Sequence, residues 1–206
     1  EAVGGKAVRI LGDVSRATQM AVRIPTRDPL IIIEHSVRWV KGFGLNYWLD
    51  YSLDGRYGKH NVNWYPDESG NLACRVTQDG RTKIEIIGPL QFGWNHVRLI
   101  VHLKRQEAYV ILNDFVRRGP LPLWNVVDEW NEIKLTFYDT GRWSDTSSVS
   151  ETESYYDDVK IFSVPAEQAE SFYENVIRGA EETAFDIEEY EPIWIEYGEV
   201  ADVPPE

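Results

Sequence analysis

Five side chains of this sequence are of the types that bind sugars. A sugar site needs an aromatic plate for the apolar ring face, and carboxylate, amide or guanidinium groups that bridge the hydroxyls. Trp48 and Asp50 provide such a pair on one alternating segment. His96, Arg98 and Glu132 are candidate partners on other segments. We expect one ligand-binding site from these residues if their strands are neighbours; cover of Trp48 by the C-terminal segment is the alternative.

A carboxylate pair at Asp128 and Glu132 could do acid–base chemistry. Asp128, Trp130 and Glu132 share a parity opposite to that of Ile133 and Leu135. Retaining glycosidases place two carboxylates about 5 Å apart, which neighbours on one face of a strand can provide. Solvated carboxylates at a strand edge are the alternative interpretation of this segment.

A polysaccharide lyase is a second type of enzyme that the residues allow. It needs a base beside a uronate and a cation or amide that neutralises the carboxylate. Five residues on outward parities could serve: Arg38, His96, Arg98, His102 and Tyr138. The polar outer faces of strands carry such residues in any case, so this alternative stays open.

Alternation of apolar residues indicates that β-strands position these side chains. The clearest segments are 6–11, 16–24, 30–40, 45–53, 59–65, 72–77, 82–87, 94–103, 108–112, 131–138 and 155–164. We predict an all-β fold for residues 6–164, an antiparallel two-sheet β-sandwich of the jelly-roll type. Its core should contain Ile33, Leu49, Leu99, Val101, Val110, Leu135 and Ile161. Segments 119–122 and 141–154 are expected to be loops, and His35 shares the core parity, which favours an interior rather than a catalytic histidine.

The acidic residues gather at the C-terminal end. The 206 residues carry a formal net charge of −13, and residues 166–206 hold thirteen of the thirty-four acids and only Arg178 among the bases. This segment therefore carries −12 and residues 1–165 carry −1. Neither part offers a basic track for phosphates, so we expect no nucleic-acid partner and no membrane binding.

The same C-terminal segment keeps apolar residues that a disordered tail would lack. Residues 166–184 have the composition and spacing of a helix, and 185–203 mix acids with aromatic residues. We expect two units, a sandwich over residues 1–165 and an acidic helix and strap over 166–206. The strap should pack on the sandwich or on a second subunit, which would make the protein a homo-oligomer.

Cysteine usage and the N-terminus say little about the compartment. Cys74 is a single cysteine on an apolar run, which favours a buried thiol and excludes internal disulfides. No apolar run is long enough to span a membrane, and no signal peptide is seen in this chain. Because the chain starts at Glu1, a leader or another domain could have been removed. Localisation stays undecided, extracellular or periplasmic if the protein is carbohydrate-active.

Three segments carry a resemblance to a known superfamily. They read GWNHVRLIV at 93–101, AYVILN at 108–113 and YYDDVKIF at 155–162. Together they resemble the concanavalin A-like lectin/glucanase superfamily, with its laminin-G-like and sugar-active members. The resemblance implies a jelly roll of two curved sheets with ligands on the concave face or its rim. The Glu-x-Asp-x-Glu motif of the family 16 glycoside hydrolases and the Gln-x-His strand of the jelly-roll lyases are absent.

The superfamily also suggests a cofactor. Its members often hold a structural calcium with a carboxylate of the last strand and oxygens near the N-terminus, which Asp157 and Asp13 would supply here. Turn-capping or solvated aspartates are the alternative. No other cofactor is expected, because motifs for zinc, nucleotides and thiol chemistry are missing.

These observations favour a carbohydrate-binding, lectin-like jelly roll that is noncatalytic or of uncharacterised activity. Its expected partner is an oligo- or polysaccharide. A carbohydrate-active enzyme, either a glycoside hydrolase or a polysaccharide lyase, is one alternative. A protein–protein interaction module that docks through its acidic C-terminal segment is the other.

Overall fold

The structure of this protein is a computed structural model. It describes residues 6–13, 17–41, 45–53, 56–57, 62–67, 69–79, 81–123, 129–140, 151–178, 193–194 and 201–202. The elements are β1 (Lys6–Asp13), β2 (Ala17–Pro25), β3 (Leu30–Lys41), β4 (Leu45–Leu53), β5 (Arg56–Tyr57), β6 (Val62–Pro66), β7 (Asn71–Gln78), β8 (Arg81–Pro89), β9 (Trp94–His102), β10 (Glu107–Leu112), β11 (Val116–Pro122), β12 (Glu132–Thr140), β13 (Glu151–Val164), α1 (Ala166–Ile177), β14 (Ile193–Trp194) and β15 (Ala201–Asp202).

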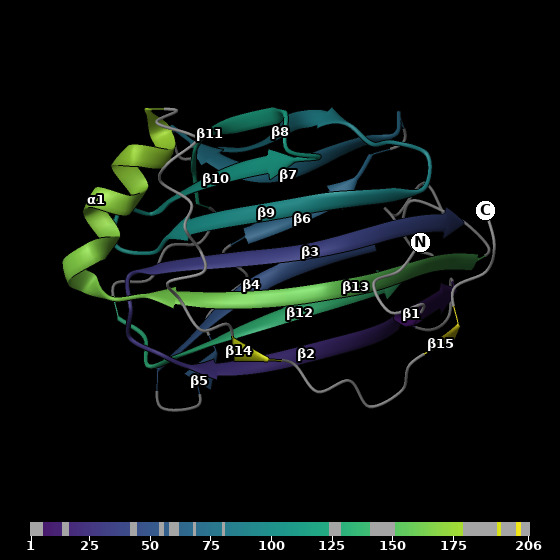
Figure 1. Ribbon diagram of the computed structural model, residues 1–206, viewed down its shortest axis with the longest axis horizontal. Helices are drawn as coiled ribbons and strands as arrows, with labels where there is room; N and C mark the ends of the chain where they lie inside the picture. Colours follow the sequence, from purple (N-terminus) through teal and green to yellow (C-terminus); the bar gives the residue numbers. More distant parts are fainter. Residues whose placement is uncertain are drawn as a thin grey trace.

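The strands form two antiparallel sheets that lie one behind the other (Figure 1). One has eight strands in the order β11-β10-β9-β3-β13-β1-β15, with β14 also paired to β13. The other has seven strands in the order β2-β12-β4-β6-β7-β8, with β5 paired to β4. The predicted all-β sandwich is confirmed.

The core lies between the two sheets, as the alternation of the sequence predicts. It contains six of the seven expected residues, each at most 1% exposed: Ile33, Leu99, Val101, Val110, Leu135 and Ile161. The side chain of Leu49 is outside the described part of the chain. Cys74 also lies in this core as a free, buried thiol, so the favoured interpretation of the single cysteine is confirmed.

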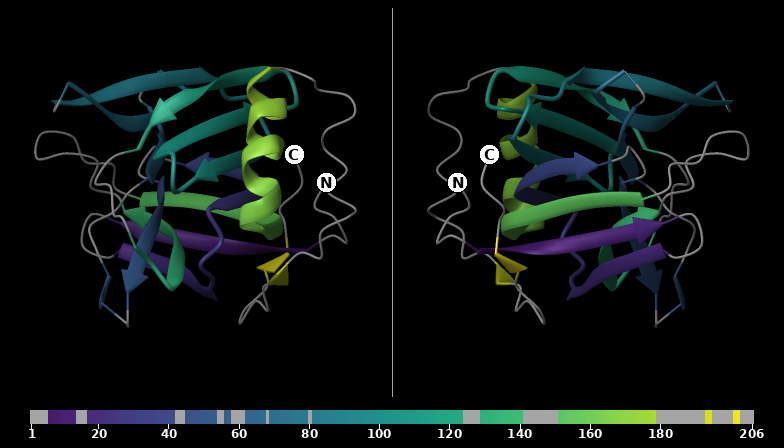
Figure 2. Two further views of the ribbon diagram at one scale, coloured as in Figure 1. Left: turned by 90° about the vertical axis from the view of Figure 1, so that its left-hand side faces the viewer. Right: turned by 90° about the vertical axis from the view of Figure 1, so that its right-hand side faces the viewer.

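A second apolar cluster lies under helix α1, on the outer face of the eight-stranded sheet. The helix crosses the sheet at one end of β9, β3 and β13 (Figures 1 and 2). Its buried side chains are Ala169, Phe172, Tyr173 and Val176, and they pack on Leu30, Ile32, Ile100 and Phe162. Residues 30–33 of β3 are therefore buried on both faces of the sheet, which accounts for their continuous apolar run.

Polar contacts fix the same helix to the end of β9. His102 Nε2 lies 3.3 Å from Glu170 Oε1, and the ring of His102 meets that of Tyr173 edge-on at 5.0 Å. Arg105 donates hydrogen bonds to Glu170 at 2.8 Å and to Glu174 at 2.5 Å. His102 was expected on an outward-facing polar parity, but it is only 1% exposed because α1 covers it.

Within the described residues, no helix is long and apolar enough to cross a membrane.

One expected loop is a strand over its whole length, and a second is a strand over its last four residues. Segment 119–122 belongs to the edge strand β11, a position where a missing proline N–H costs no ladder hydrogen bond. Residues 151–154 belong to β13, and 141–150 lie outside the described residues. The expected helix over 166–184 ends at Ile177, with 179–184 again outside the description.

Candidate functional site

The outer face of the eight-stranded sheet changes from apolar to polar beyond helix α1. On β3 and β9, Ile32 and Ile100 face α1, whereas Ile33 and Leu99 face the core between the sheets. Residues two, four and six positions after Ile32 on β3, and the same distances before Ile100 on β9, point to the same outer side. We call this surface the polar face and define it as Arg9, Glu34, Ser36, Arg38, Trp94, His96, Arg98, Tyr155 and Asp157.

The strand register arranges these residues in three rows across the sheet. The first row runs from Trp94 through Arg38 and Tyr155 to Arg9, so aromatic and guanidinium groups alternate. The second row holds His96, Ser36 and Asp157, and the third holds Arg98 and Glu34, with Lys160 of β13 next to Glu34 outside the polar face. Neighbouring strands lie about 4.8 Å apart, so side chains within a row are close neighbours.

Several charged groups of the polar face are buried although they point away from the core. Glu34, Arg38 and Asp157 are between 7% and 9% exposed. The Nε of Arg98 donates a hydrogen bond to Glu34 Oε1, and the backbone N–H of Asp158 donates to Asp157 Oδ1 at 2.8 Å. A charge withdrawn from water is tolerated when it is paired in this way. The middle of the polar face is therefore a preformed network.

Tyr155 lies at the β1 side of this network and connects an arginine to a carboxylate. Its hydroxyl donates a hydrogen bond to Glu153 at 2.6 Å, and the Nε of Arg9 donates to the same carboxylate at 2.8 Å. The guanidinium of Arg9 also lies 6.0 Å from the centre of the Tyr155 ring, within the range of a cation–π contact. Burial raises the pKa of Tyr155, and its bond to Glu153 raises it further. The phenol therefore stays protonated at neutral pH.

His96 lies at the opposite side of the polar face, beside the β10–β11 turn. Its Nδ1 is 3.4 Å from Asp114 Oδ1, and about a third of its side chain is exposed. Its backbone N–H donates to Asn113 Oδ1 at 2.9 Å, and Asn113 in turn donates to Asn95 at 3.1 Å. Asn113 and Asp114 both have positive φ, a conformation that Asn and Asp tolerate better than most residues. The turn thus holds an accessible imidazole in place.

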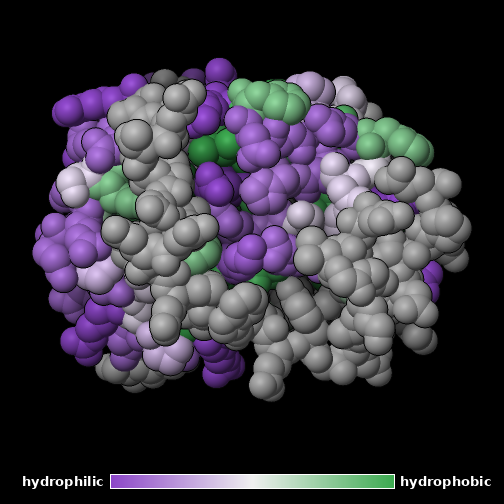
Figure 3. All heavy atoms as spheres, viewed as in Figure 1, coloured by the Kyte–Doolittle hydropathy of each residue, from purple (hydrophilic) through white to green (hydrophobic). Residues whose placement is uncertain are grey.

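The polar face offers both hydrogen-bond donors and acceptors. Figure 3 shows hydrophilic side chains over the middle of this side of the molecule. Guanidinium groups bind carboxylates and hydroxyl oxygens, carboxylates accept from hydroxyl groups, and aromatic rings cover apolar faces. An arrangement of this kind can bind a polyhydroxylated ligand.

The structure divides the five sequence-predicted binding residues between the two sheets. His96 and Arg98 lie together on β9 of the eight-stranded sheet. Trp48 and Asp50 lie on β4, next to Glu132 on β12, in the seven-stranded sheet. The assumed adjacency of these three strands is therefore not found. The side chains of Trp48 and Asp50 are outside the description, and sugar binding by either group stays a prediction.

The expected Asp-x-Trp-x-Glu face is not a continuous one. Strand β12 begins only at Glu132, and Trp130 packs against the core between the sheets. Strand parity does not extend beyond the strand, so Trp130 does not share an outward face with Glu132. Asp128 lies outside the described residues, as does the side chain of Tyr138 from the lyase alternative.

The two expected calcium ligands are far apart along paired strands. Asp13 is opposite Glu151, whereas Asp157 lies six residues further along β13 and opposite Ser36 of β3. Six residues of strand span roughly 20 Å, so the two aspartates cannot bind one Ca²⁺. Among the described residues, no group of three or more His, Cys, Asp or Glu side chains could hold a metal ion.

The polar face includes residues that the sequence alone did not single out. These are Arg9, Glu34, Ser36, Trp94 and Tyr155. Each stands on the outward parity of its strand, which the sequence could have indicated. Their assembly depends on the order β9-β3-β13-β1, and alternation within a strand does not specify which strand lies beside it.

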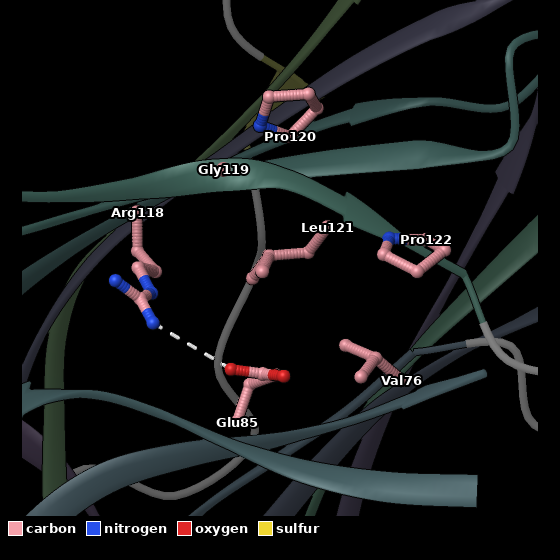
Figure 4. Close-up of a pocket in the computed structure, with 7 residues that line it drawn as sticks. All are labelled: Val76, Glu85, Arg118, Gly119, Pro120, Leu121 and Pro122. Atoms are coloured by element: carbon pink, nitrogen blue, oxygen red, sulfur yellow. Dashed lines mark ion pairs between the residues drawn. The ribbon is translucent and has the colours of Figure 1, made fainter. Parts of the chain in front are cut away.

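A small cavity lies elsewhere, between the edge strands β8 and β11 of the two sheets. Its volume is about 350 Å³, and it is lined by Val76, Glu85 and residues 118–122. Figure 4 shows Arg118 and Glu85 pointing toward one another across it, and their charged groups are 3.6 Å apart. Cys74 is opposite Glu85 on β7, and burial raises the pKa of its thiol to about 12. The cavity therefore lacks a reactive thiolate.

Solved structures share this fold, although no protein-family model and no curated protein matches the sequence. A sialidase superposes with a TM-score of 0.58 at 12% identity, over 85% of this chain and 18% of the sialidase chain. Alginate lyase A1-II', a member of polysaccharide lyase family 7, superposes with a TM-score of 0.54 at 12% identity, over 77% of this chain and 80% of the lyase. The same lyase in complex with product gives 0.53 at 14% identity. This chain thus spans less than a fifth of the sialidase. At such identities the likeness shows the fold alone.

Proposed function

We propose that this chain is a carbohydrate-binding domain and that the polar face binds an oligo- or polysaccharide. The row Trp94, Arg38, Tyr155 and Arg9 carries the proposal. It alternates aromatic rings with guanidinium groups on four adjacent strands, which is the combination that sugar rings and their substituents require. The partly buried pair of Glu34 and Arg98 near this row gives it a rigid support.

The solved structures with this fold support a carbohydrate ligand. Two kinds of neighbour with a TM-score above 0.5 are named for acting on sugars, a sialidase and an alginate lyase. Alginate is therefore the first ligand to test. The arginines of the polar face would bind its carboxylates, and Glu34, Glu153 and Asp157 would accept hydrogen bonds from its hydroxyls.

A polysaccharide lyase is the second candidate function. One observation favours it: His96 and Arg98 share β9, and Arg38 lies on the adjacent strand β3. An imidazole could take the proton next to a uronate carboxylate while a guanidinium neutralises that carboxylate. The electron pair of the broken C–H bond would then form a C=C bond as the neighbouring glycosidic C–O bond breaks, and the departing oxygen would take a proton from water. The unsaturated sugar that remains absorbs ultraviolet light.

Titration calorimetry with single-residue variants tests the proposed site. A screen over alginate and neutral oligosaccharides first selects the ligand. Arg9→Ala and His96→Ala remove partly exposed side chains of the polar face, and each should raise the Kd about tenfold or more, close to 1.4 kcal/mol. Arg27→Ala is the matched control, because Arg27 is exposed in the connection between β2 and β3, and it should leave the Kd unchanged.

Two results would contradict the proposal. One is binding that both polar-face variants retain at full strength, and the other is no binding to any carbohydrate of the screen. The lyase candidate needs a further readout on the same samples. Absorbance that grows when parent protein is mixed with alginate, and that is lost with His96→Ala, would support it.

A further inference from the structure

The two sheets end very differently on the side of the sandwich where β8 and β11 lie. Strand β11 contains Pro120 and Pro122, and its register with β10 shifts between Ala108 and Val110. Prolines and bulges are the usual devices that prevent an edge strand from pairing with another chain. Strand β8 has neither over residues 81–86; its bulge and Pro89 come at its far end.

Strand β8 is an open edge within the described part of the chain. It pairs with β7 on one side, and no described strand pairs with its other side. It lies at the margin of the molecule, where the β7–β8 hairpin projects from the sandwich (Figure 2). Alternate backbone N–H and C=O groups along such an edge are available to a further strand.

The side chains of β8 suit a strand that is covered in the working molecule. Ile84 and Ile86 point to the outer face of the seven-stranded sheet and are 57% and 44% exposed. Lys83 and Glu85 occupy the alternate positions, and Glu85 reaches Arg118 at the edge of the other sheet. These two isoleucines are neighbours on one face and form an exposed apolar stripe. In a monomer the contact of this stripe with water would be unfavourable.

The order of these residues is self-complementary in one antiparallel register. Directly opposite residues in a sheet point to the same face. When two identical strands pair around a two-fold axis, both faces of the sheet continue from one copy to the other only if one residue lies opposite its own copy at the axis. An axis at Glu85 would put that carboxylate against its own copy, and an axis at Lys83 would oppose two ammonium groups. An axis at Ile84 pairs Lys83 with Glu85 twice and places Ile84 against Ile84.

We propose that a second copy of this chain pairs with β8 through this register. The two copies are related by a two-fold axis at Ile84, and their seven-stranded sheets join into one continuous antiparallel sheet. The interface is isologous, so it closes at two copies and forms no fibre. It is separate from the polar face and does not depend on the function proposed above.

Light scattering after size-exclusion chromatography tests this dimer on the full chain. The parent should have twice the 23.8 kDa mass of one chain. Ile84→Asp places two carboxylates together at the axis, and Lys83→Glu opposes the acid at position 83 to Glu85; both should give folded monomers. Val40→Asp is the matched control on β3, because Val40 is an exposed β-branched strand residue, and it should stay dimeric.

A covalent test does not depend on destabilising the interface. Ile84→Cys puts one thiol per copy at the axis, where oppositely placed strand residues are close enough for a disulfide. Mild oxidation should cross-link nearly all of this variant into a dimer on a nonreducing gel and leave Val40→Cys uncross-linked. A parent of single-chain mass at working concentrations would overturn the proposal, and Lys83 and Glu85 would then protect the edge. A dimer that persists in Ile84→Asp and fails to cross-link would also overturn it.

Discussion

His35 shows what complete burial does to a titratable side chain. It is inaccessible to solvent between the sheets, with the Tyr156 ring centre 5.7 Å away. Burial lowers its pKa from the ordinary 6.5 to about 3, and the charge of His96 contributes in the same direction. Between this value and the ordinary pKa, the imidazole binds a proton in the unfolded state but not in the folded state. This histidine therefore couples folding to pH.

The sign of this coupling gives a prediction for stability. Above about pH 6.5 the imidazole is neutral in both states and has no effect on the pH dependence. As the pH falls toward 3, only the unfolded state binds the proton, and the free energy of unfolding should fall by about 1.4 kcal/mol per pH unit. Denaturant unfolding of parent and His35→Gln between about pH 6 and pH 4 measures it. In His35→Gln the free energy of unfolding should depend less on pH, because the histidine's contribution to the slope is gone. Equal slopes in the two proteins would contradict a lowered pKa of His35 in the folded state.

At the scale of elements, helix α1 explains why one sheet is covered on both faces. Its apolar side occupies the outer surface of β9, β3 and β13, and Arg105 and His102 hold its acidic side chains at the end of β9. Burial lowers the pKa of His102, against the opposing effect of the Glu170 carboxylate. The helix belongs to the acidic C-terminal segment, so this part of the segment is fixed to the sandwich.

The packing of α1 gives a second prediction, made with a pair of adjacent residues. Val176 is 2% exposed against the sheet, whereas Asn175 faces solvent. Val176→Asp buries an uncompensated carboxylate and should lower the free energy of unfolding by at least about 2 kcal/mol. Asn175→Asp introduces the same group in water and should change it by less than about 0.5 kcal/mol. Chemical denaturation checks both, and equal stability of the two variants would show that the helix is not anchored through this face.

Alternation within strands was enough to predict the fold and most of its core. It correctly placed Ile33, Leu99 and Leu135 inside, because a half-buried strand repeats every two residues. It failed for His102, since the outward parity of one sheet is covered by a helix that is distant in sequence. The apolar run 30–33 carried that information, because a strand with both faces apolar is usually covered on both sides.

The candidate site was harder to predict, for a related reason. His96 and Arg98 were singled out from parity, but their neighbours on β3, β13 and β1 follow from strand order, which arises from contacts far apart in sequence. The same limitation put Glu132 and Trp48 in the expected site, although their strands belong to the other sheet. Likewise, Asp13 and Asp157 were expected to lie close together because one is near the N-terminus and the other is in the last strand of the sandwich. The register of β1 with β13 instead places them far apart along the strands.

At the scale of the whole molecule, the sandwich presents two separate surfaces with different chemistry. The polar face lies on the eight-stranded sheet, and the apolar stripe of β8 lies at the edge of the seven-stranded sheet. Two copies joined at β8 would carry two polar faces. A polysaccharide long enough to reach both would bind more tightly than a single-site oligosaccharide.

Backbone NMR of the isotope-labelled protein during an alginate oligosaccharide titration tests the central claim most directly, because it reports the location of the ligand. The account predicts that amide signals shift along β3, β9 and β13 at the rows of Arg38 and His96, while those of β4 and β12 stay in place. Shifts confined to β4 and β12 would move the site to the strands of Trp48, Asp50 and Glu132. Such a result, or an unchanged spectrum with this and every other carbohydrate tested, would contradict carbohydrate binding at the polar face.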